Sequence, residues 1–176
     1  NGDWKIMEDF WRTSTGDDCA RRLDDPHNIN LSTLDTACPE GILNRKQPKF
    51  YNEQNYWIDY NQHPDCDNGG VHINCGVMNY WFYILANGGE GVSPIGITKA
   101  SEITYHNMMY YMCSMYNSFS DAKNGSIMAA MDLYGSCSNE VIQTIKAWDA
   151  VGVTSVGGIN YDIYLDNIQS DEQFST

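Results

Sequence analysis

The spacing of apolar residues changes close to Gly70. Upstream of it, turn-forming clusters interrupt the chain and no helical or strand period is sustained, which predicts an irregular first part. Downstream, apolar residues recur at steps of three and four, which is typical of the buried face of a helix. These residues are Ile73, Val77, Trp81, Ile84 and Leu85. We expect a helix of about four turns that ends at Asn87, where two glycines follow.

Two further helices are expected between Thr98 and Gly135. The first takes Thr98 as its N-cap and carries Glu102 in its first turns. Its inward residues are Ala100, Ile103, Met108, Tyr111 and Met115. The second follows a cap at Ser118 or Ser120 and stops at Gly135. Its inward residues are Ile127, Ala130, Met131 and Tyr134.

A last helix is expected from about Ser138 to Ala150, with Gly152 beyond its end. Its inward residues are Val141, Ile145 and Trp148. These helices predict a mainly α fold, a helical bundle with an irregular first part. Apolar and polar residues then alternate from Ile159 to Leu165, so the tail has a possible short strand.

The charge of the chain excludes some classes of partner. Its 176 residues include 10 Lys+Arg and 23 Asp+Glu, a formal net charge of −13 at pH 7. Such an acidic surface repels nucleic-acid phosphates and anionic membranes. No apolar stretch approaches the ~20 residues that span a bilayer. We therefore expect no nucleic-acid binding and no membrane span.

The cysteines indicate an oxidising compartment. There are six, an even number, in an acidic chain rich in Tyr, Asn and Gly, which favours an exported protein with disulfides. They are Cys19, Cys38, Cys66, Cys75, Cys113 and Cys137. The sequence alone does not rank their possible pairings.

Reactive side chains are densest between Asp65 and Cys75. His72 follows two glycines at the start of a helix, so Asp67 or Asp65 could hold one ring nitrogen while the other faces a cleft. Such an imidazolium could stabilise an oxyanion, although a capping histidine with no catalytic role is the plainer interpretation. A rival hypothesis is a structural zinc site with two nitrogen and two sulfur ligands. Its ligands would be His63, Cys66, His72 and Cys75.

The amino-terminal residues carry a second polar cluster. Its oxygen donors, of the kind that Ca²⁺ prefers, are Asn1, Asp3, Glu8, Asp9, Asp17 and Asp18. Lys5 and Arg12 would oppose a tight cation site. Arg21 could bind a substrate carbonyl, or the Arg21-Arg22 pair could form surface ion pairs with Asp24 or Asp25. The sequence holds no H-E-x-x-H motif.

The segment Asp67-Asn68-Gly69-Gly70-Val71-His72-Ile73-Asn74 resembles the carboxy-terminal domain of thermolysin-family zinc metallopeptidases. Further matches precede this segment at residues 1–6, 8–9 and 20–26, and follow it at residues 76–77, 79–85, 95–100, 129–135 and 147–153. The resemblance covers residues 1–153 and implies the α-helical domain of that family. Residues 154–176 lie outside it and would be a tail, a linker or the start of a further domain.

The resemblance also implies roles for single residues. His72 matches the histidine that hydrogen-bonds the tetrahedral intermediate, Asp67 the acid that orients it, and Arg21 the arginine that grips the substrate carbonyl. The positions that line the primed-side pocket, which selects the residue after the scissile bond, are matched by Ile6, Phe10 and Ala20. Cys75 stands where the family usually has a serine.

Metals are implied by the resemblance as well. The family's zinc ligands and catalytic glutamate lie upstream of the position that matches Asn1. We therefore expect this chain to pair with a missing amino-terminal zinc-bearing domain, and to be inactive alone. Asn1, Asp3 and Glu8 match positions of a calcium site, but Lys5 departs from the pattern, so we expect weak calcium binding or none.

Two functions are compatible with these observations. The first is the carboxy-terminal half of a bacterial zinc metalloendopeptidase, secreted or at the cell surface, that acts on peptides or proteins. The alternative is a non-catalytic secreted binding module derived from a degenerate thermolysin-like peptidase. Retention of His72, Asp67 and Arg21 together favours the enzyme.

Overall fold

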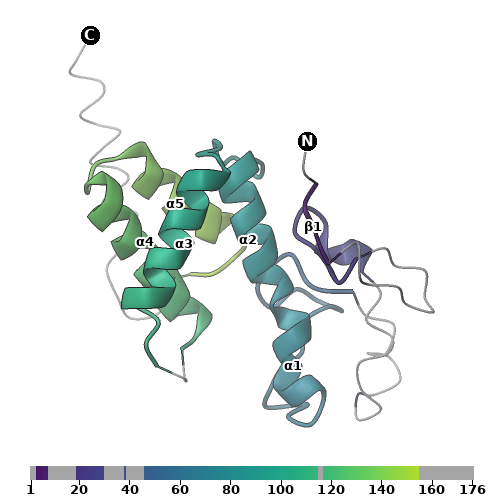
Figure 1. Cartoon of the computed structure of the whole chain (residues 1–176). Helices are drawn as coiled ribbons and strands as arrows, with labels where there is room; N and C mark the ends of the chain where they lie inside the picture. The colour runs from purple at the N-terminus through teal and green to yellow at the C-terminus, as the bar shows by residue number, and fades with distance from the viewer. Residues whose placement is uncertain (1–2, 8–18, 30–37, 39–45, 115–116, 155–176) are drawn as a thin grey trace. The chain divides into compact units, whose positions relative to one another are not determined.

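The computed structural model describes residues 3–7, 19–29, 38, 46–114 and 117–154 (Figure 1). The chain divides into two compact units, residues 1–84 and residues 85–176, and the boundary falls within a helix. The elements are β1 (Lys5–Ile6), β2 (Arg21–Arg22), the 3₁₀ helix η1 (Pro26–Asn28), α1 (Asp67–Asn74), α2 (Gly76–Asn87), α3 (Ile97–Tyr110), α4 (Phe119–Tyr134) and α5 (Asn139–Ala150). The prediction of a mainly α fold is confirmed.

The first unit contains more irregular chain than helix. Its two strands are two residues each and pair antiparallel, with Lys5 opposite Arg22 and Ile6 opposite Arg21. The segment from residue 46 to residue 66 runs through turns without a regular helix or strand. The expected irregular first part is therefore confirmed. The strand pair was not predicted, because two residues are too few to show an alternation of apolar and polar positions.

The single helix expected up to Asn87 is divided in two. α1 and α2 meet at Cys75, and α1 is regular only from Val71, because the three residues before it have positive φ angles. The predicted end at Asn87 is confirmed. The predicted apolar face of α2 is buried; its members Val77, Trp81, Ile84 and Leu85 are at most 1% exposed.

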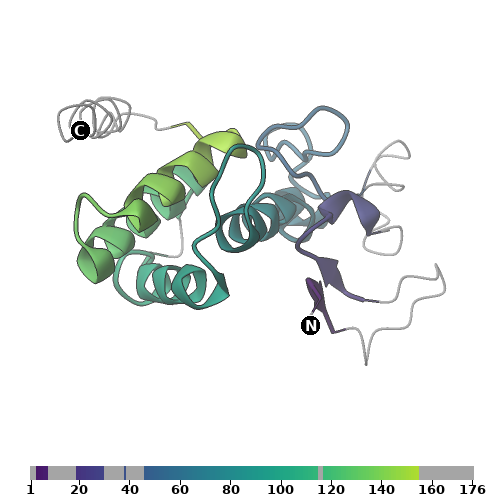
Figure 2. The ribbon, with the colours of Figure 1, turned by 90° about the horizontal axis from the view of Figure 1, so that it is seen from above.

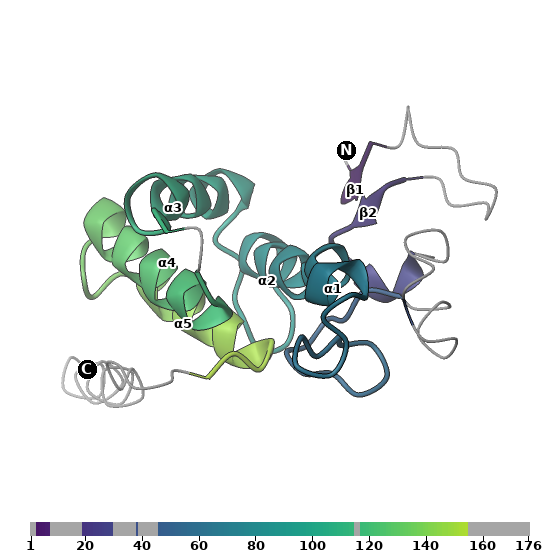
Figure 3. The ribbon, with the colours of Figure 1, turned by 90° about the horizontal axis from the view of Figure 1, so that it is seen from below.

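The second unit is a bundle in which α4 contacts both α3 and α5 (Figures 2 and 3). Its core consists of Ile103, Ile127, Ala129, Ala130, Val141 and Ile145. Ser118 caps α4 through a reciprocal capping box with Asp121, and Gly135 ends the helix, as predicted. Ser138 caps α5. Trp148 is fully buried and its indole Nε1 donates to the hydroxyl of Ser126 at 2.6 Å.

Predictions for α3 were wrong in two details. The helix begins at Ile97 with Gly96 as its N-cap, so Thr98 lies inside it. Met108 is 58% exposed, whereas the neighbouring Asn107 is buried. The reason is that the Asn107 amide donates to the Ala122 carbonyl of α4 at 3.0 Å, a polar contact that an apolar pattern cannot reveal.

Parts of the sequence predictions fall outside the described residues. Met115 and the possible strand between Ile159 and Leu165 are among them. Within the part of the chain that the structure describes, every helix is too short or too polar to cross a bilayer.

Candidate functional site

The site is built on a turn of left-handed backbone that leads into α1. Four consecutive residues have positive φ, from 52° at Asp67 and 50° at Asn68 to 76° at Gly69 and 88° at Gly70. Asp and Asn tolerate this conformation better than most residues, and glycine adopts it freely. A Cβ on Gly70 would lie 2.6 Å from the Cβ of Ile58. The sequence of this turn therefore permits a close approach that other residues would block.

The turn brings the Asp67 carboxylate onto the first amide groups of the regular part of α1. Its Oδ2 accepts hydrogen bonds from the backbone N–H of His72 at 2.8 Å and of Ile73 at 3.0 Å. Both N–H groups belong to the first turn of the regular part of α1, where backbone donors usually lack a partner within the helix, so the carboxylate caps it. Asp67 is thereby fixed in position by the backbone that it caps.

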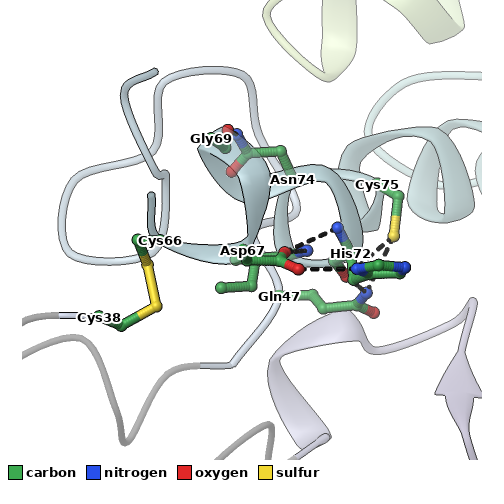
Figure 4. Close-up of polar contacts among 9 residues, drawn as sticks. Cys38, Gln47, Cys66, Asp67, Gly69, His72, Asn74 and Cys75 are labelled. Carbon is green, nitrogen blue, oxygen red and sulfur yellow. Dashed lines mark hydrogen bonds and ion pairs between the residues drawn. A yellow bond between two sulfur atoms is a disulfide. The ribbon is translucent and has the colours of Figure 1, made fainter. Parts of the chain in front are cut away.

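The second oxygen of Asp67 holds the imidazole of His72. Asp67 Oδ1 lies 2.7 Å from His72 Nδ1, and the two side chains point toward one another in Figure 4. The carboxylate is 5% exposed, whereas the imidazole is 59% exposed. Because Nδ1 faces the buried acid, Nε2 is left directed away from the pair, where it can meet another molecule. The structure pairs His72 with Asp67 rather than with Asp65.

Two anchors hold the turn from behind. Asn74 of α1 is buried, accepts from the backbone N–H of Ile58 at 3.0 Å, and donates to the carbonyl of Ile58 at 2.8 Å. Cys66, which directly precedes Asp67, forms a disulfide with Cys38. The rival hypothesis of a zinc site with Cys66 as a ligand is therefore wrong, because its sulfur is in the disulfide.

The strand pair places Arg21 beside two other predicted site residues, Ile6 and Ala20. Ile6 lies directly opposite Arg21, and directly opposed residues of an antiparallel pair project from the same face. The backbone N–H of Ala20 donates to the carbonyl of Ile6 at 2.8 Å. The Arg21 guanidinium donates from Nη1 to the Ala20 carbonyl at 2.6 Å. Three predicted site residues, Ile6, Ala20 and Arg21, therefore lie next to one another.

Arg22 behaves differently from Arg21. Its Nε lies 3.7 Å from an oxygen of Asp24. This is one of the ion pairs that the sequence predicted as an alternative for the two arginines. The guanidinium of Arg21 instead donates to the Ala20 carbonyl. The neighbouring arginines of one strand therefore differ: Arg22 pairs with an acid, and Arg21 bonds to the backbone.

Sequence reasoning missed Gln47 altogether. Its side chain is fully buried, and its Nε2 donates to the carbonyl of His72 at 2.7 Å and to the sulfur of Cys75 at 3.1 Å. Cys75 in turn donates to the carbonyl of His72 at 3.0 Å. Burial raises the pKa of the Cys75 thiol, against the opposing effect of the Arg21 charge, so the group is a thiol at neutral pH.

Comparison with known proteins identifies the family of the chain. The family model of the thermolysin metallopeptidase α-helical domain matches residues 1–153. The chain belongs to this family. Among curated relatives it is 34% identical over 157 residues to a bacillolysin of Bacillus caldolyticus, and 34% identical over 157 residues to a thermolysin of Alicyclobacillus acidocaldarius subsp. acidocaldarius. In both cases the match covers 87% of this chain but 24% of the relative.

The structure describes only some of the other positions that the resemblance assigned to the substrate pocket and to calcium. Phe10, Asn1 and Glu8 lie outside the described residues. Asp3 is described, and its carboxylate is engaged by Lys5: Oδ1 accepts from the Lys5 backbone N–H at 3.1 Å and Oδ2 lies 3.8 Å from Lys5 Nζ. A lysine ammonium beside this carboxylate disfavours a calcium ion at the same place.

Within the described residues, no three His, Cys, Asp or Glu side chains come close enough together to hold a metal ion. Membership of the thermolysin metallopeptidase family implies a zinc ion in the parent protein. The groups around His72 are one imidazole, the Asp67 carboxylate, which caps α1, and the Cys75 thiol, which is hydrogen-bonded to Gln47 and to the His72 carbonyl. This donor set does not fit a catalytic zinc centre. An exposed imidazole held by a carboxylate can instead donate a hydrogen bond to a polarised oxygen.

Proposed function

We propose that this chain is the substrate-gripping half of a zinc metalloendopeptidase, and that His72, Asp67 and Arg21 carry that role. The observation that carries the proposal is the pairing of the buried Asp67 carboxylate with Nδ1 of the exposed His72 imidazole at 2.7 Å. Membership of the thermolysin metallopeptidase α-helical domain family supports the class of reaction.

His72 would act on charge that develops during peptide hydrolysis. A peptide carbonyl becomes a negatively charged oxygen in the tetrahedral intermediate, and a donor fixed in advance stabilises that charge more than it stabilises the substrate. His72 Nε2–H would be this donor. Asp67 would fix the tautomer and the direction of the ring, as a carboxylate does at the second nitrogen of a catalytic histidine.

Arg21 would bind a carbonyl of the same substrate. A guanidinium presents several N–H donors in a planar fork, and one Arg21 nitrogen is already fixed on the Ala20 carbonyl. The remaining donors would grip the carbonyl on the leaving-group side of the scissile bond. Beside them, the primed-side pocket would be lined by Ile6, Phe10 and Ala20.

Zinc would be held elsewhere in the parent protein. The chain spans about a quarter of the length of the relatives it matches, so we propose an amino-terminal zinc-bearing domain as its partner. When bound there, zinc would activate the attacking water. We further propose that the isolated chain is inactive, that the parent is a secreted bacterial protein, and that the domain ends at residue 153.

The test is peptide hydrolysis by the parent protein. His72→Ala should lower kcat about 100-fold, the effect of removing one oxyanion donor. His106→Ala is the matched control, because His106 also pairs with an aspartate, Asp132, at 3.1 Å but lies in the second unit. An equal rate in the parent and in His72→Ala would refute the assigned role. A parent without any turnover would favour the non-catalytic binding module.

A further inference from the structure

A cavity in the first unit lies outside the residues assigned to peptide binding. It has a volume of about 370 Å³ and is formed by the irregular segment between residues 52 and 63. Small-molecule sites in proteins typically have volumes of about 300–1,000 Å³, so the cavity is large enough for a small ligand. Most of its lining residues carry an amide or a carboxylate. The amides are Asn52, Gln54, Asn55 and Gln62, and the carboxylates are Glu53 and Asp59.

Two consecutive turns fix the backbone of this lining. The first turn closes on the carbonyl of Glu53, which accepts a hydrogen bond from the backbone N–H of Trp57 at 3.0 Å. The second closes on the carbonyl of Asp59, which accepts from the backbone N–H of His63 at 2.9 Å. The side chains around the cavity therefore belong to two closed turns rather than to an extended loop.

The residue between the two turns is held by α1. Ile58 is 1% exposed, and the buried side chain of Asn74 accepts from its N–H at 3.0 Å and donates to its carbonyl at 2.8 Å. The turns cannot move away from α1 without breaking these two hydrogen bonds. Walls that are fixed in advance lower the ordering cost of binding, so the cavity is prepared for a ligand.

Both carboxylates of the cavity are already oriented by the protein. Glu53 Oε2 accepts from the backbone N–H of Lys49 at 2.8 Å. Asp59 Oδ1 accepts from the backbone N–H of Asn61 at 2.9 Å, and its Oδ2 accepts from the amide of Gln62 at 3.1 Å. A carboxylate offers about four lone-pair positions, so Asp59 can accept further hydrogen bonds from the hydroxyl groups of a ligand.

The lining disfavours several classes of ligand. Among the described residues, two carboxylates but no lysine or arginine line the cavity, so an anion would be repelled. The same lining contains no aliphatic side chain that would cover a lipid chain. No three His, Cys, Asp or Glu side chains of the described part of the chain come close enough to hold a metal ion. The ligand that this chemistry favours is neutral and rich in hydroxyl groups.

The ring of Trp57 adds a flat apolar surface to the cavity. The edge-to-face contact between Trp57 and Tyr51, with ring centroids 4.7 Å apart and planes at 61°, helps to fix this ring. A pyranose sugar has a face of C–H groups that can pack on an aromatic ring. It also has a rim of hydroxyl groups, which donate and accept as the surrounding amides do. The lining therefore matches both surfaces of a sugar.

We propose that this cavity binds a neutral sugar unit, with Trp57 against the C–H face of the sugar and the amides and carboxylates on its hydroxyl groups. The site goes beyond the proposed function and does not depend on it. Two sources present the same chemistry: a free polysaccharide, and a glycan attached to a protein substrate.

The experiment is saturation-transfer NMR on the parent protein with the methyl glycosides of glucose, galactose, mannose and N-acetylglucosamine. At least one should bind with a Kd of about 1 mM, as expected for a ligand of about a dozen non-hydrogen atoms. Trp57→Ala should weaken this binding at least about tenfold, because it removes the aromatic anchor. Trp57→Phe should stay within about threefold, since it keeps an aromatic face. Binding of none of the four glycosides would overturn the proposal.

Two further variants complete the design. Tyr105→Ala is the matched control, because it removes an aromatic side chain that is 64% exposed on α3 of the second unit, and it should leave the affinity unchanged. If Trp57→Ala does not fold, Gln54→Ala removes an exposed amide of the lining and should weaken binding about fivefold. Folding of each variant is checked by its circular dichroism melting curve. Unchanged affinity in the folded lining variants would show that the sugar binds elsewhere.

A competition experiment separates this cavity from the peptide site. A phosphinic peptide, which mimics the tetrahedral intermediate of peptide hydrolysis, should leave the sugar signal unchanged at a saturating concentration. If it displaces the sugar, the sugar occupies the peptide site and the proposal is overturned. The proposed function is tested by the rate of His72→Ala instead, so either proposal can fail while the other stands.

The source of the sugar is identified with one trisaccharide that contains the best-binding unit. Its Kd is measured for the free trisaccharide and for the same trisaccharide linked to a peptide. Equal values indicate a free polysaccharide, whereas a lower Kd for the linked form indicates a glycoprotein substrate. Each of these results supports a sugar site, and loss of binding in both forms would contradict it.

Discussion

Each of the two units contains a histidine paired with an aspartate, but the more exposed member of the pair is the histidine in the first unit and the aspartate in the second. In the first unit the acid Asp67 is 5% exposed and the imidazole of His72 is 59% exposed. In the second unit the acid Asp132 is 44% exposed, and the imidazole of His106 is 23% exposed and lies against the ring of Tyr110 at 4.4 Å. The residue types are the same, but only the first pair presents its imidazole to other molecules.

The two pairs differ in what holds each carboxylate. Asp67 is fixed by the backbone N–H groups of the helix that it caps, so it can hold His72 without help from solvent. Asp132 accepts hydrogen bonds from His106 and from Tyr111 instead, and these bonds join α4 to α3. The first pair leaves its imidazole exposed, whereas the second connects two helices.

The largest expected effect is on the apolar core of the second unit. Ile127→Ala should lower the free energy of unfolding of this unit by about 2–5 kcal/mol, because it leaves a cavity among buried residues. Amide hydrogen exchange should accelerate across α4 while α1 keeps its protection. Leu133→Ala, at a position 40% exposed on the same helix, is the control with little effect. Equal acceleration in α1 would show that the units do not differ in this way.

The disulfide is the corresponding anchor of the first unit. Removing it with Cys38→Ala and Cys66→Ala should cost about 3 kcal/mol for a link between residues 28 positions apart. Hydrogen exchange should accelerate in α1, which follows Cys66, and should stay unchanged in α4. Cys113→Ala serves as the control. Loss of protection confined to α4 would contradict the prediction.

The two acids should differ in their effect on catalysis. Asp67→Ala should lower kcat/KM of the parent protein about 30-fold, because it frees the His72 ring and uncaps α1. Asp132→Ala should leave kcat/KM unchanged, since it loosens only a contact between α3 and α4. If both variants lose activity equally, the distinction between the pairs is wrong.

The smallest expected effect is the response of the second unit to acid. Hydrogen bonds from Tyr111 and His106 lower the pKa of Asp132, and hydrogen bonds from Ser118 lower that of Asp121, each from an ordinary value of 3.8. A carboxyl with a lowered pKa stabilises the fold above its unfolded pKa, and that contribution is lost as pH falls through the folded pKa. Melting temperature of this unit should therefore be steady near neutral pH and fall below about pH 4. Asp132→Asn should reduce the slope, and an unchanged slope would remove Asp132 from the account.

Much of the helical unit could be predicted from sequence, because its helices carry regular apolar faces and local caps. Ser118, Gly135 and Ser138 act on neighbouring backbone groups, so their type and position suffice. Met108 was placed wrongly because the buried position beside it belongs to Asn107, whose partner lies on another helix. A rule based on apolar spacing assigns such a polar residue to the surface.

Only those residues of the site that belong to a recognisable sequence motif could be predicted. Asp67 and His72 are five residues apart in a recognisable turn, and the resemblance, rather than a pattern of spacing, singled out Arg21 over Arg22. Gln47 was missed because it is one amide in a segment without periodicity, and its two partners are known only once the chain is folded. The same holds for the Cys38–Cys66 disulfide, which sequence could not choose among the possible pairings.

The most direct test of the central claim is the binding of a phosphinic peptide, a mimic of the tetrahedral intermediate, to the parent protein and to His72→Ala. If His72 stabilises the oxyanion, the substitution should weaken binding of the mimic about 100-fold, the factor by which it lowers kcat, while KM for the peptide changes by less than about threefold. Unchanged affinity for the mimic would contradict the claim that this unit presents His72 to the reacting carbonyl.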